Sequence, residues 1–288
     1  MRFFIDSAKL SEIEEAYSWG IIEGVTTNPS LIKKAVEYEN KRGNNVFLEN
    51  YIKKILKVAK GTPVSLEVTS TDYESMVSEA KNLFKKFNSV AKNVYIKIPV
   101  NPSLCDDDSC KRKDFDGIKA IRELSKLKIP VNCTLIFSPE QALMAAKAGA
   151  KLVSPFVGRE DDFLREKAHI KFNKNDYFSA LGIKDKGKDK KINDEGIISG
   201  VDLVKKCVDL LRADKKIKTE VLAASIRNKQ QLREVAIAGA DIVTLPFEVL
   251  KEIIVHHKTS EGMKNFVGDV VEEYSKLRRG IENRVVKK

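Results

Sequence analysis

Eight short apolar or β-branched runs recur along this chain of 288 residues, and stretches with helical spacing of apolar residues separate them. The strands predicted from these runs are Phe3–Ile5, Gly24–Thr26, Val64–Val68, Asn93–Ile98, Val131–Leu135, Lys151–Ser154, Glu220–Ala223 and Asp241–Thr244. The helices predicted between them include Tyr73–Phe87, Gln141–Ala148, Val201–Leu211 and Gln231–Ala238. Strands that alternate with helices pair in parallel, so eight such units predict an α/β fold, the (β/α)8 TIM barrel with parallel strands.

An internal echo supports the parallel α/β architecture. The segment Ala146–Phe156 resembles Ala236–Phe247, and each is interpreted as a helix end, a glycine turn, a buried strand and a proline stop. The echo is equally compatible with a doubly wound sheet, which stays open on this evidence. No predicted strand is followed by G-x-G-x-x-G or G-x-x-x-x-G-K-[ST], which argues against the usual nucleotide-binding loops.

The length suits one barrel domain over residues 1–288. Two polar, charged stretches, near 101–114 and 160–195, follow predicted strands and are expected to be loop insertions. A C-terminal helix is predicted over 259–277, where Val, Phe and Tyr mix with charges. We expect this helix to pack on a partner subunit, which predicts a homo-oligomer.

The overall charge and the apolar pattern limit the classes of partner. A formal net charge of +11 raises nucleic acid as a partner. The lysine-rich run Lys184–Lys191 contains no aromatic residue that could stack on bases, so a solvated surface is the preferred interpretation and nucleic acid is unlikely. Every apolar run is shorter than about 18 residues, so no membrane span is expected.

The cysteines and the N-terminus predict a cytoplasmic protein. Four cysteines stand at irregular positions, as expected of reduced thiols, and the first residues lack the pattern of a secretion signal. Cys105 and Cys110 flank three aspartates, but a solvated acidic turn is preferred over a metal site because no second Cys/His pair accompanies them.

Polar residues end the apolar runs, where catalytic groups of barrels lie. They are Asp6, the run Thr26-Thr-Asn28-Pro29, Glu67, Lys97, Asn132, Thr134, Ser154, Ser225 and Arg227. The three histidines, His169, His256 and His257, fall outside this set, which disfavours histidine-dependent chemistry.

Lys97 is the most informative of these residues. In Val94-Tyr-Ile-Lys-Ile-Pro-Val100 an ammonium group interrupts a run that would otherwise be buried, and desolvation favours the neutral amine. A neutral amine can attack a carbonyl and form an imine, which then acts as an electron sink for carbon–carbon bond cleavage. The alternative is a strand lysine that reaches solvent or pairs with Glu67 for structure.

Two carboxylates and two arginines could complete such a site. Asp6 and Glu67 lie in apolar surroundings, which suits one general acid and one general base, although each could instead be a structural hydrogen-bond partner. Arg159 and Arg227 follow the sixth and seventh strands and could bind a phosphate together with nearby serines. For either arginine alone, a surface salt bridge is the simpler interpretation.

Taken together, these residues resemble the transaldolase family, in particular its short branch that includes the fructose-6-phosphate aldolases. The resemblance covers nearly the whole chain outside the two long polar stretches. It runs through Phe3-Phe-Ile-Asp-Ser-Ala8, Gly24-Val-Thr-Thr-Asn-Pro-Ser-Leu31, Val64-Ser-Leu-Glu-Val68, Lys97-Ile-Pro99, Asn132-Cys-Thr-Leu-Ile-Phe-Ser138, Ser154-Pro-Phe-Val-Gly-Arg159, Glu220-Val-Leu-Ala-Ala-Ser-Ile-Arg-Asn228 and Thr259-Ser-Glu-Gly262.

The resemblance implies a role for each site residue and a transaldolase of the pentose phosphate pathway. Lys97 would form the Schiff base with a ketose phosphate, Asp6 would take the hydroxyl proton as the C–C bond breaks, and Glu67 would act through a water held by Thr134. The remaining residues would contact the sugar phosphate: Asn28 and Asn132 at its hydroxyls, Phe156 beside it, and Ser154, Arg159, Ser225 and Arg227 at its phosphate. No metal or organic cofactor is implied.

Two positions bear on the branch of the family. Glu at position 67 and Phe at position 156 accompany transaldolases, whereas Gln and Tyr accompany the direct aldolases, so transfer of a dihydroxyacetone unit is favoured. The alternative is an aldolase that releases free dihydroxyacetone, and a non-catalytic basic binding barrel is the alternative from another class. The departures from the family pattern are the stretch 101–114 and the longer segment after Arg159, which would border the mouth of the barrel.

Overall fold

The computed structural model describes residues 1–44, 46–104, 114–184, 190–271 and 274. In chain order its elements are β1 (Arg2–Asp6), α1 (Leu10–Ser18), β2 (Ile22–Thr26), α2 (Pro29–Lys41), α3 (Leu48–Val58), β3 (Val64–Glu67), α4 (Tyr73–Ala91), β4 (Val94–Pro99), α5 (Asp116–Lys126), β5 (Val131–Ile136), α6 (Pro139–Ala148), β6 (Leu152–Pro155), α7 (Val157–Lys167), α8 (Gly200–Ala213), β7 (Glu220–Ala223), α9 (Lys229–Ile237), β8 (Ile242–Leu245), α10 (Phe247–Ile253) and α11 (His257–Gly268).

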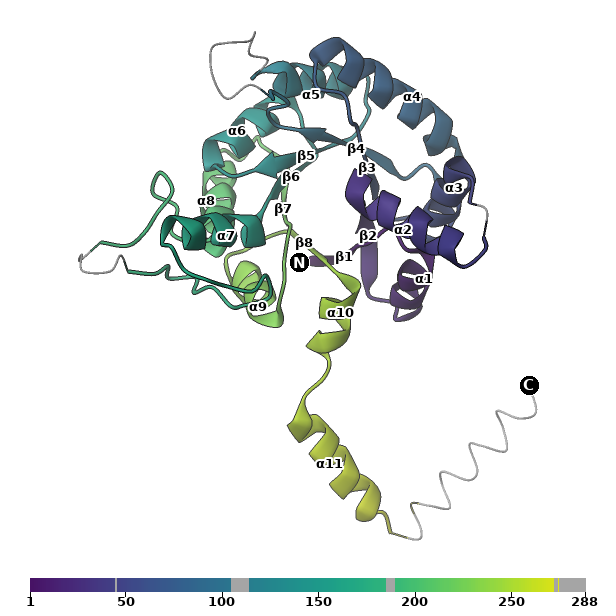
Figure 1. Ribbon diagram of the computed structural model, residues 1–288, viewed down its shortest axis with the longest axis vertical. Coiled ribbons are helices and arrows are strands. Elements are labelled where there is room, and N and C mark those ends of the chain that lie inside the picture. The colour runs from purple at the N-terminus through teal and green to yellow at the C-terminus, as the bar shows by residue number, and fades with distance from the viewer. Residues whose placement is uncertain (45, 105–113, 185–189, 272–273, 275–288) are drawn as a thin grey trace. The chain divides into compact units, whose positions relative to one another are not determined.

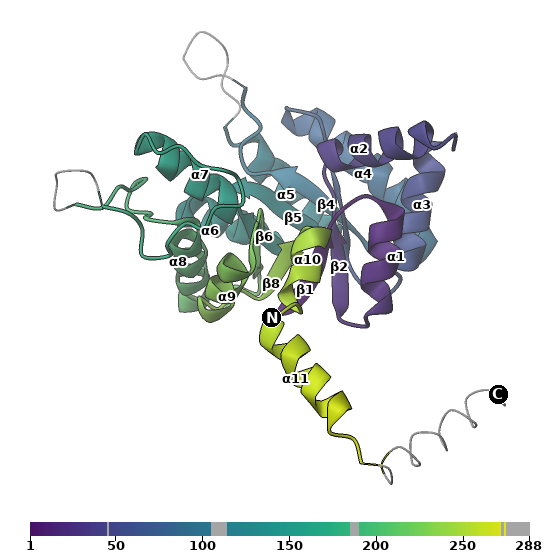
Figure 2. The same cartoon turned by 60° about the horizontal axis from the view of Figure 1, so that its bottom comes forward.

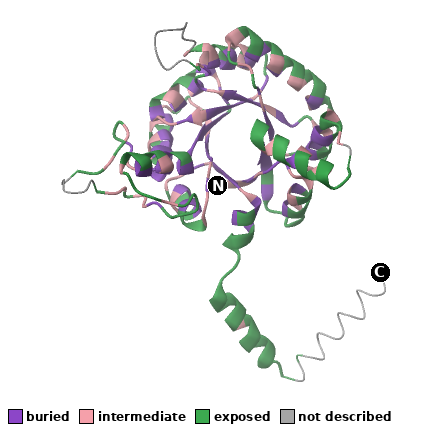
Figure 3. Ribbon diagram, viewed as in Figure 1, coloured by how far each residue is buried: buried purple, intermediate pink, exposed green. Residues whose placement is uncertain are grey.

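The strands form a closed parallel barrel, seen end-on in Figure 1. Each strand pairs with the next along the chain, and β8 pairs with β1 to close the ring. This confirms the predicted (β/α)8 barrel and removes the doubly wound sheet. All eight predicted strands form, and their bounds shift by at most two residues. Figure 3 shows the strands as the buried layer, with helices that are exposed on their outer side.

Several helices begin directly after a strand because a capping residue stands there. Asn28 caps α2 by accepting a hydrogen bond from the Leu31 N–H at 2.9 Å. Ser138 and Gln141 form a capping box at the start of α6, and Asn228 caps α9. These early helix starts keep the βα connections short, so the polar strand ends stay at the mouth of the barrel.

The internal echo corresponds to two equivalent βα units. Gly149 after α6 and Gly239 after α9 have φ angles of 103° and 91°, a left-handed conformation that glycine adopts without steric cost. β6 and β8 follow these turns, as the echo predicts.

The long stretch after β6 begins with a helix, so the prediction of a loop from residue 160 is wrong for its first part. α7 continues to Lys167, and its buried face includes the polar residues Glu160, Asp161 and Arg165. A buried helix face that is largely polar has no apolar periodicity, which is why the pattern did not reveal it. The described residues 168–184 and 190–199 form an excursion without a regular helix or strand, visible in Figure 2 near α7 and α8. In the other predicted insertion, residues 105–113 lie outside the described residues.

The predicted C-terminal helix forms in its first part. α11 ends at Gly268, residues 269–271 are not helical and Tyr274 is helical again, whereas the prediction was one helix to residue 277. Glycine is common where helices end. Residues 272, 273 and 275–277 lie outside the described residues. Residues 1–250 form one compact unit, and the described chain from Lys251 onward belongs to another. No helix in the described ranges is long and apolar enough to cross a membrane.

Candidate active site

A cavity of about 100 Å³ lies at the carboxyl ends of the barrel strands. It is lined by Asp6, Thr26, Asn28, Lys97, Ser154, Phe156, Arg159, Leu222, Ala224, Ser225 and Thr244. Larger hollows of about 880, 550 and 260 Å³ lie beside α1 and α3, at the amino ends of β5 to β7, and between the start of α6 and residues 194–197. None of these contains a predicted site residue, so the chemistry of the lining and not its size identifies the candidate site.

Lys97 reaches this cavity from the middle of the barrel and pairs with Glu67. The two residues are register partners on the adjacent strands β4 and β3. The Lys97 side chain is only 7 % exposed, its Nζ lies 3.0 Å from a Glu67 carboxylate oxygen, and it donates to the backbone oxygen of Thr27 at 3.3 Å. The ion pair that the sequence left open as a structural role therefore exists. It also places a proton acceptor beside the amine.

Asp6 forms the opposite wall at the end of β1. Thr26 Oγ1 donates to its Oδ1 at 2.7 Å, and the Thr244 hydroxyl lies 2.6 Å from Thr26. Burial raises the pKa of Asp6, and this effect outweighs the opposing influence of Lys97, the Thr26 hydrogen bond and Arg159. A carboxylate with a raised pKa is a better proton acceptor near neutral pH.

Asn132 is hydrogen-bonded inside the barrel through its side-chain amide and does not line the cavity. Its Nδ2 donates to the Ser65 hydroxyl at 3.2 Å, and its Oδ1 accepts from the Ser154 hydroxyl at 2.7 Å. Of these three residues only Ser154 lines the cavity. These two bonds use one of the two N–H groups of the Asn132 amide, so its role at a substrate hydroxyl stays a prediction.

Thr134 is two residues further along β5, on the same face as Asn132. It is fully buried, and its hydroxyl has no hydrogen-bond partner in the part of the chain that the structure describes. Thr134 does not line the cavity, but buried hydroxyls almost always have partners, so this unpartnered hydroxyl is a functional candidate.

Phe156 and Arg159 form the wall on the β6 side. The Phe156 ring is 9 % exposed and lies 5.9 Å from Lys97 Nζ and 5.1 Å from the Arg159 guanidinium carbon, both measured to the ring centroid. The Phe137 ring packs against it at a centroid distance of 5.9 Å. Arg159 stands in the first turn of α7, so its charge and the positive end of that helix act on the same side of the cavity.

Ser225 lies in a strained turn after β7. Its φ is 61°, a value that non-glycine residues seldom adopt, and its backbone oxygen accepts from the Gly158 N–H at 3.1 Å. A Cβ at Gly158 would lie 2.4 Å from that oxygen and 2.6 Å from Arg227 Nε. Glycine at position 158 therefore permits the close approach of this turn to α7.

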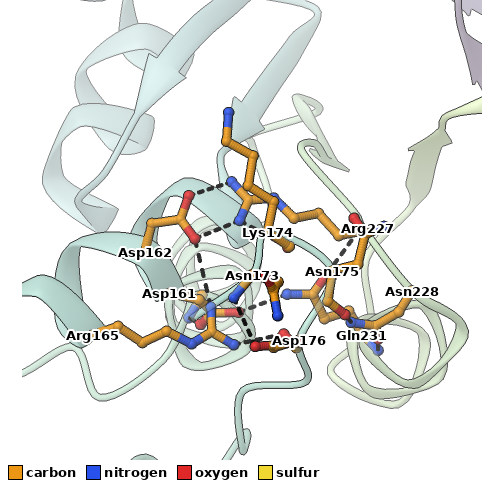
Figure 4. A network of polar contacts seen from close by, with 11 residues as sticks. Asp161, Asp162, Arg165, Asn173, Lys174, Asn175, Asp176, Arg227, Asn228 and Gln231 are labelled. Carbon is orange, nitrogen blue, oxygen red and sulfur yellow. Dashed lines mark hydrogen bonds and ion pairs between the residues drawn. The ribbon is translucent and has the colours of Figure 1, made fainter. Parts of the chain in front are cut away.

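Arg227 does not line the cavity as the structure stands. Its guanidinium makes two hydrogen bonds to the Asp162 carboxylate on α7 and donates to the backbone oxygen of Lys174 at 3.1 Å (Figure 4). The salt bridge that the sequence left as the simpler interpretation is present.

No group of three or more His, Cys, Asp or Glu residues that could hold a metal ion occurs in the described chain. Free cysteines Cys133 and Cys207 are buried, and burial raises the pKa of both thiols. The pair Cys105 and Cys110 lies outside the described residues.

The sequence pattern of the transaldolase/fructose-6-phosphate aldolase family matches residues 3–285. The chain belongs to this family. It is 39 % identical over 272 residues to a probable transaldolase of Thermoplasma acidophilum, and the matched region covers 93 % of this chain and 95 % of that relative. A probable transaldolase of Caldicellulosiruptor saccharolyticus is 40 % identical over 93 % of this chain and 96 % of its own length, and one of Kosmotoga olearia is 39 % identical over 96 % and 98 %.

The structure of this family member adds residues that the strand-end rule did not select. Thr244 bonds to Thr26, which holds the Asp6 carboxylate, Ser65 holds Asn132, and Asp162 holds Arg227. Thr26 is among the predicted strand ends, and Thr244 nearly ends an apolar run, so the rule could have included it. Ser65 and Asp162 carry no such signal, because their importance comes from partners that are 67 and 65 residues away.

Proposed function

We propose that the chain is a transaldolase that moves a dihydroxyacetone unit from a ketose phosphate to an aldose phosphate, as in the pentose phosphate pathway. The observation that carries this proposal is the buried amine of Lys97, which faces the cavity 3.0 Å from Glu67, with Asp6 lining the same cavity. The relatives that are named probable transaldolase support a transfer activity over an unrelated activity on the same barrel fold.

Lys97 is the covalent residue of this proposal. Its neutral amine attacks the ketose carbonyl carbon after its extra proton passes to Glu67, and loss of the carbonyl oxygen as water leaves a protonated imine. The Thr134 hydroxyl, which lacks a partner in the described structure, would orient a water between Glu67 and the reacting carbon.

Asp6 then acts as the base of the cleavage step. It accepts the proton of the hydroxyl on the carbon beyond the bond that breaks, the bonding electrons pass to the protonated imine, and the aldose phosphate leaves. A second aldose phosphate accepts the three-carbon unit by the reverse steps. The raised pKa of Asp6 suits this role, because the carboxylate must hold and return a proton near neutral pH.

The substrate-binding residues divide between two ends of the cavity. Asn28 uses its side-chain oxygen as a helix cap and keeps its amide N–H groups for a sugar hydroxyl, and Asn132 would contact another hydroxyl. Ser154, which donates to Asn132 and lines the cavity, would contribute to phosphate binding. Arg159 and Ser225 line the mouth and would bind the phosphate, with Arg227 beside them. No metal or organic cofactor takes part in this scheme.

The free cysteines and α11 bear on the cellular location and the oligomeric state of the enzyme. We propose a cytoplasmic location, because Cys133 and Cys207 are free thiols. We also propose that the barrel functions within a homo-oligomer, because apolar side chains of α11 are exposed. Nucleic acid and membranes are not expected partners.

Borohydride trapping tests the covalent step. Incubation with fructose 6-phosphate and borohydride should reduce the imine and add the three-carbon or six-carbon unit to Lys97, which peptide mass spectrometry would locate. Lys97→Met should show no adduct and no turnover, whereas the surface variant Lys205→Met should react like the wild type. An adduct at another lysine, or none, contradicts the mechanism. Full activity after EDTA treatment is also expected, and a loss restored by a divalent ion would contradict the metal-free scheme.

An aldolase that releases free dihydroxyacetone is the second candidate, because the family includes both activities. The two differ in whether turnover of fructose 6-phosphate needs an acceptor aldehyde such as erythrose 4-phosphate. Glu67 and Phe156 favour transfer. A non-catalytic basic barrel is disfavoured, because a binding module has no need for a buried lysine, two carboxylates and an unpartnered threonine in one site.

A further inference from the structure

Asp162 lies between two arginines at the edge of the candidate site. Its carboxylate binds the Arg227 guanidinium through two hydrogen bonds and lies 3.5 Å from Arg165 Nη1 (Figure 4). The side chains of Asp162, Arg227 and Arg165 are 17 %, 14 % and 5 % exposed, so they interact in a largely desolvated environment. An ion pair buried to this degree holds its geometry more strictly than one at the surface.

Arg165 is itself held from several sides. Its guanidinium lies 4.9 Å from the centroid of the Phe172 ring and 5.0 Å from that of Phe178, and it donates to the backbone oxygen of Asp176 at 2.6 Å. The excursion after α7 supplies all three of these partners. It also supplies the Lys174 oxygen that accepts from Arg227, so one segment contacts both arginines.

A second set of contacts holds the backbone of Arg227. Gln231 accepts from the Arg227 N–H at 2.9 Å and donates from its amide nitrogen to Asp161 at 2.6 Å. Asp161 also accepts from the Gly200 N–H at 2.7 Å, which ties the turn after β7 to both α7 and α8. The position of Arg227 is therefore determined at its main chain as well as at its guanidinium.

The donors of Arg227 can be counted. A guanidinium has five N–H groups. Asp162 takes one from each terminal nitrogen and Lys174 takes the second from Nη1, so the Nε–H and one Nη2–H remain without a partner in the described structure. These two N–H groups form the side edge of the fork, which matches two oxygens of a phosphate. Nε lies beside Gly158, the residue before Arg159, which lines the cavity.

The local charge balance also suits an anion. Arg159, Arg165 and Arg227 contribute three positive charges, and the carboxylates of Asp162 and Asp161, which act on Arg165 and Arg227, compensate two of them. The remaining positive charge favours a phosphate where water is partly excluded.

We propose that Asp162 and Arg165 are positioning residues for phosphate recognition, which hold Arg227 so that its Nε–Nη2 edge receives the phosphate of the sugar. The inference rests on the proposed function and assigns a purpose to the excursion after α7, which carries the partners of Arg165. If Asp162 instead masked Arg227 from the substrate, removing its charge would lower the KM for fructose 6-phosphate. The experiment therefore distinguishes the two arrangements.

Asp162→Asn is the test variant, because it keeps the size of the side chain and removes its charge and one acceptor. With erythrose 4-phosphate as acceptor, its KM for fructose 6-phosphate should rise about tenfold or more, as expected when a charge-assisted contact is weakened, while kcat changes less than about twofold. With fructose, which lacks the phosphate, kcat/KM should equal that of the wild type. The inhibition constant of inorganic phosphate should rise in parallel with KM.

Three further variants make the result specific. Asp209→Asn removes an exposed carboxylate that pairs only with Lys205 on α8 in the described structure, and it should behave like the wild type. Combining Asp162→Asn with Arg227→Ala should give the KM of Arg227→Ala alone, because Asp162 acts through that arginine. If Asp162→Asn does not fold, Arg165→Lys, which keeps the charge but loses the fork, should show the same selective rise in KM.

The outcomes separate the two levels of the proposal. A wild type that turns over fructose 6-phosphate, together with an Asp162→Asn variant whose KM is unchanged or lower, would overturn the positioning role and leave the proposed function intact. An equal loss with fructose and fructose 6-phosphate would also overturn it, because that is the result of a structural role alone. A wild type without turnover of fructose 6-phosphate would instead contradict the proposed function.

Discussion

Phe156 lies close to both ends of the candidate site, since its ring is near the Lys97 amine and the Arg159 guanidinium. A phenyl ring offers no hydrogen-bond donor to a water beside the imine. Phe156→Tyr adds a phenolic hydroxyl that could orient such a water, so release of free dihydroxyacetone by imine hydrolysis should increase relative to transfer.

The measurement is the rate of dihydroxyacetone release from fructose 6-phosphate with and without erythrose 4-phosphate. The wild type should turn over rapidly only with the acceptor, and Phe156→Tyr should raise the acceptor-independent rate. Phe163→Tyr, a change on the exposed side of α7, is the matched control. A wild type that releases dihydroxyacetone equally fast without acceptor would be a direct aldolase.

Gly158 is the residue at which a single methyl group should disturb the phosphate end of the site. In Gly158→Ala the new Cβ would lie 2.4 Å from the Ser225 backbone oxygen, so the turn that carries Ser225 and Arg227 must shift. We expect a higher KM for fructose 6-phosphate and a loss of about 1–3 kcal/mol of stability, typical of overpacking. Steady-state kinetics and denaturant unfolding would measure these changes. Gly268→Ala, where no atom lies within 4 Å, should change neither, and a normal KM in Gly158→Ala would contradict the close approach.

α7 is unusual among the helices because it buries carboxylates against the barrel. Burial raises the pKa of Glu160 to about 7, with the nearby charges of Asp194 and Asp161 adding to the effect, and raises that of Asp161 to about 6. One Glu160 oxygen has no hydrogen-bond partner in the described structure. The native protein therefore holds protons that the unfolded chain, with ordinary pKa values of 4.5 and 3.8, has already released.

This difference determines the sign of the pH dependence. Because the native state binds more protons, the free energy of unfolding should fall as the pH rises from 4.5 to about 7. Glu160→Gln removes the buried charge, so it should be more stable than the wild type at pH 8, and the advantage should shrink toward pH 5. Urea unfolding at both pH values would measure it, with Glu37→Gln on the exposed face of α2 as control. A Glu160→Gln variant that is less stable at pH 8 would show that the carboxylate is stabilising.

For the whole molecule, α11 presents a row of exposed apolar side chains. Met263, Phe266 and Val267 recur at helical spacing, and each is more than half exposed. If this row packs on a second copy of the chain, Met263→Asp with Phe266→Asp should reduce the oligomer measured by analytical ultracentrifugation and leave the barrel folded by circular dichroism. Asn265→Ala is the matched control. An unchanged sedimentation coefficient would exclude α11 as the subunit contact.

The sequence by itself determined the barrel and most of the residues that line the candidate site. Apolar runs of strand length, separated by helical spacing, can bury their surfaces only as a layered parallel sheet, and the polar residue that ends each run then lies at one end of it. Lys97 is recognisable because burying a charged side chain inside an apolar run costs free energy unless the charge has a partner or a catalytic role. Both facts depend on neighbours in the sequence.

Only the tertiary structure decided which side chains meet. The Asp162–Arg227 pair joins residues 65 positions apart, and the Ser65–Asn132 bond joins residues 67 apart, so neither has a local signal. The same holds for α7. Its inner face is polar because its partners lie in distant turns, so hydrophobic periodicity does not reveal this helix. A polar side chain can satisfy its hydrogen bonds with many residue types, and the packing of the folded chain selects one of them.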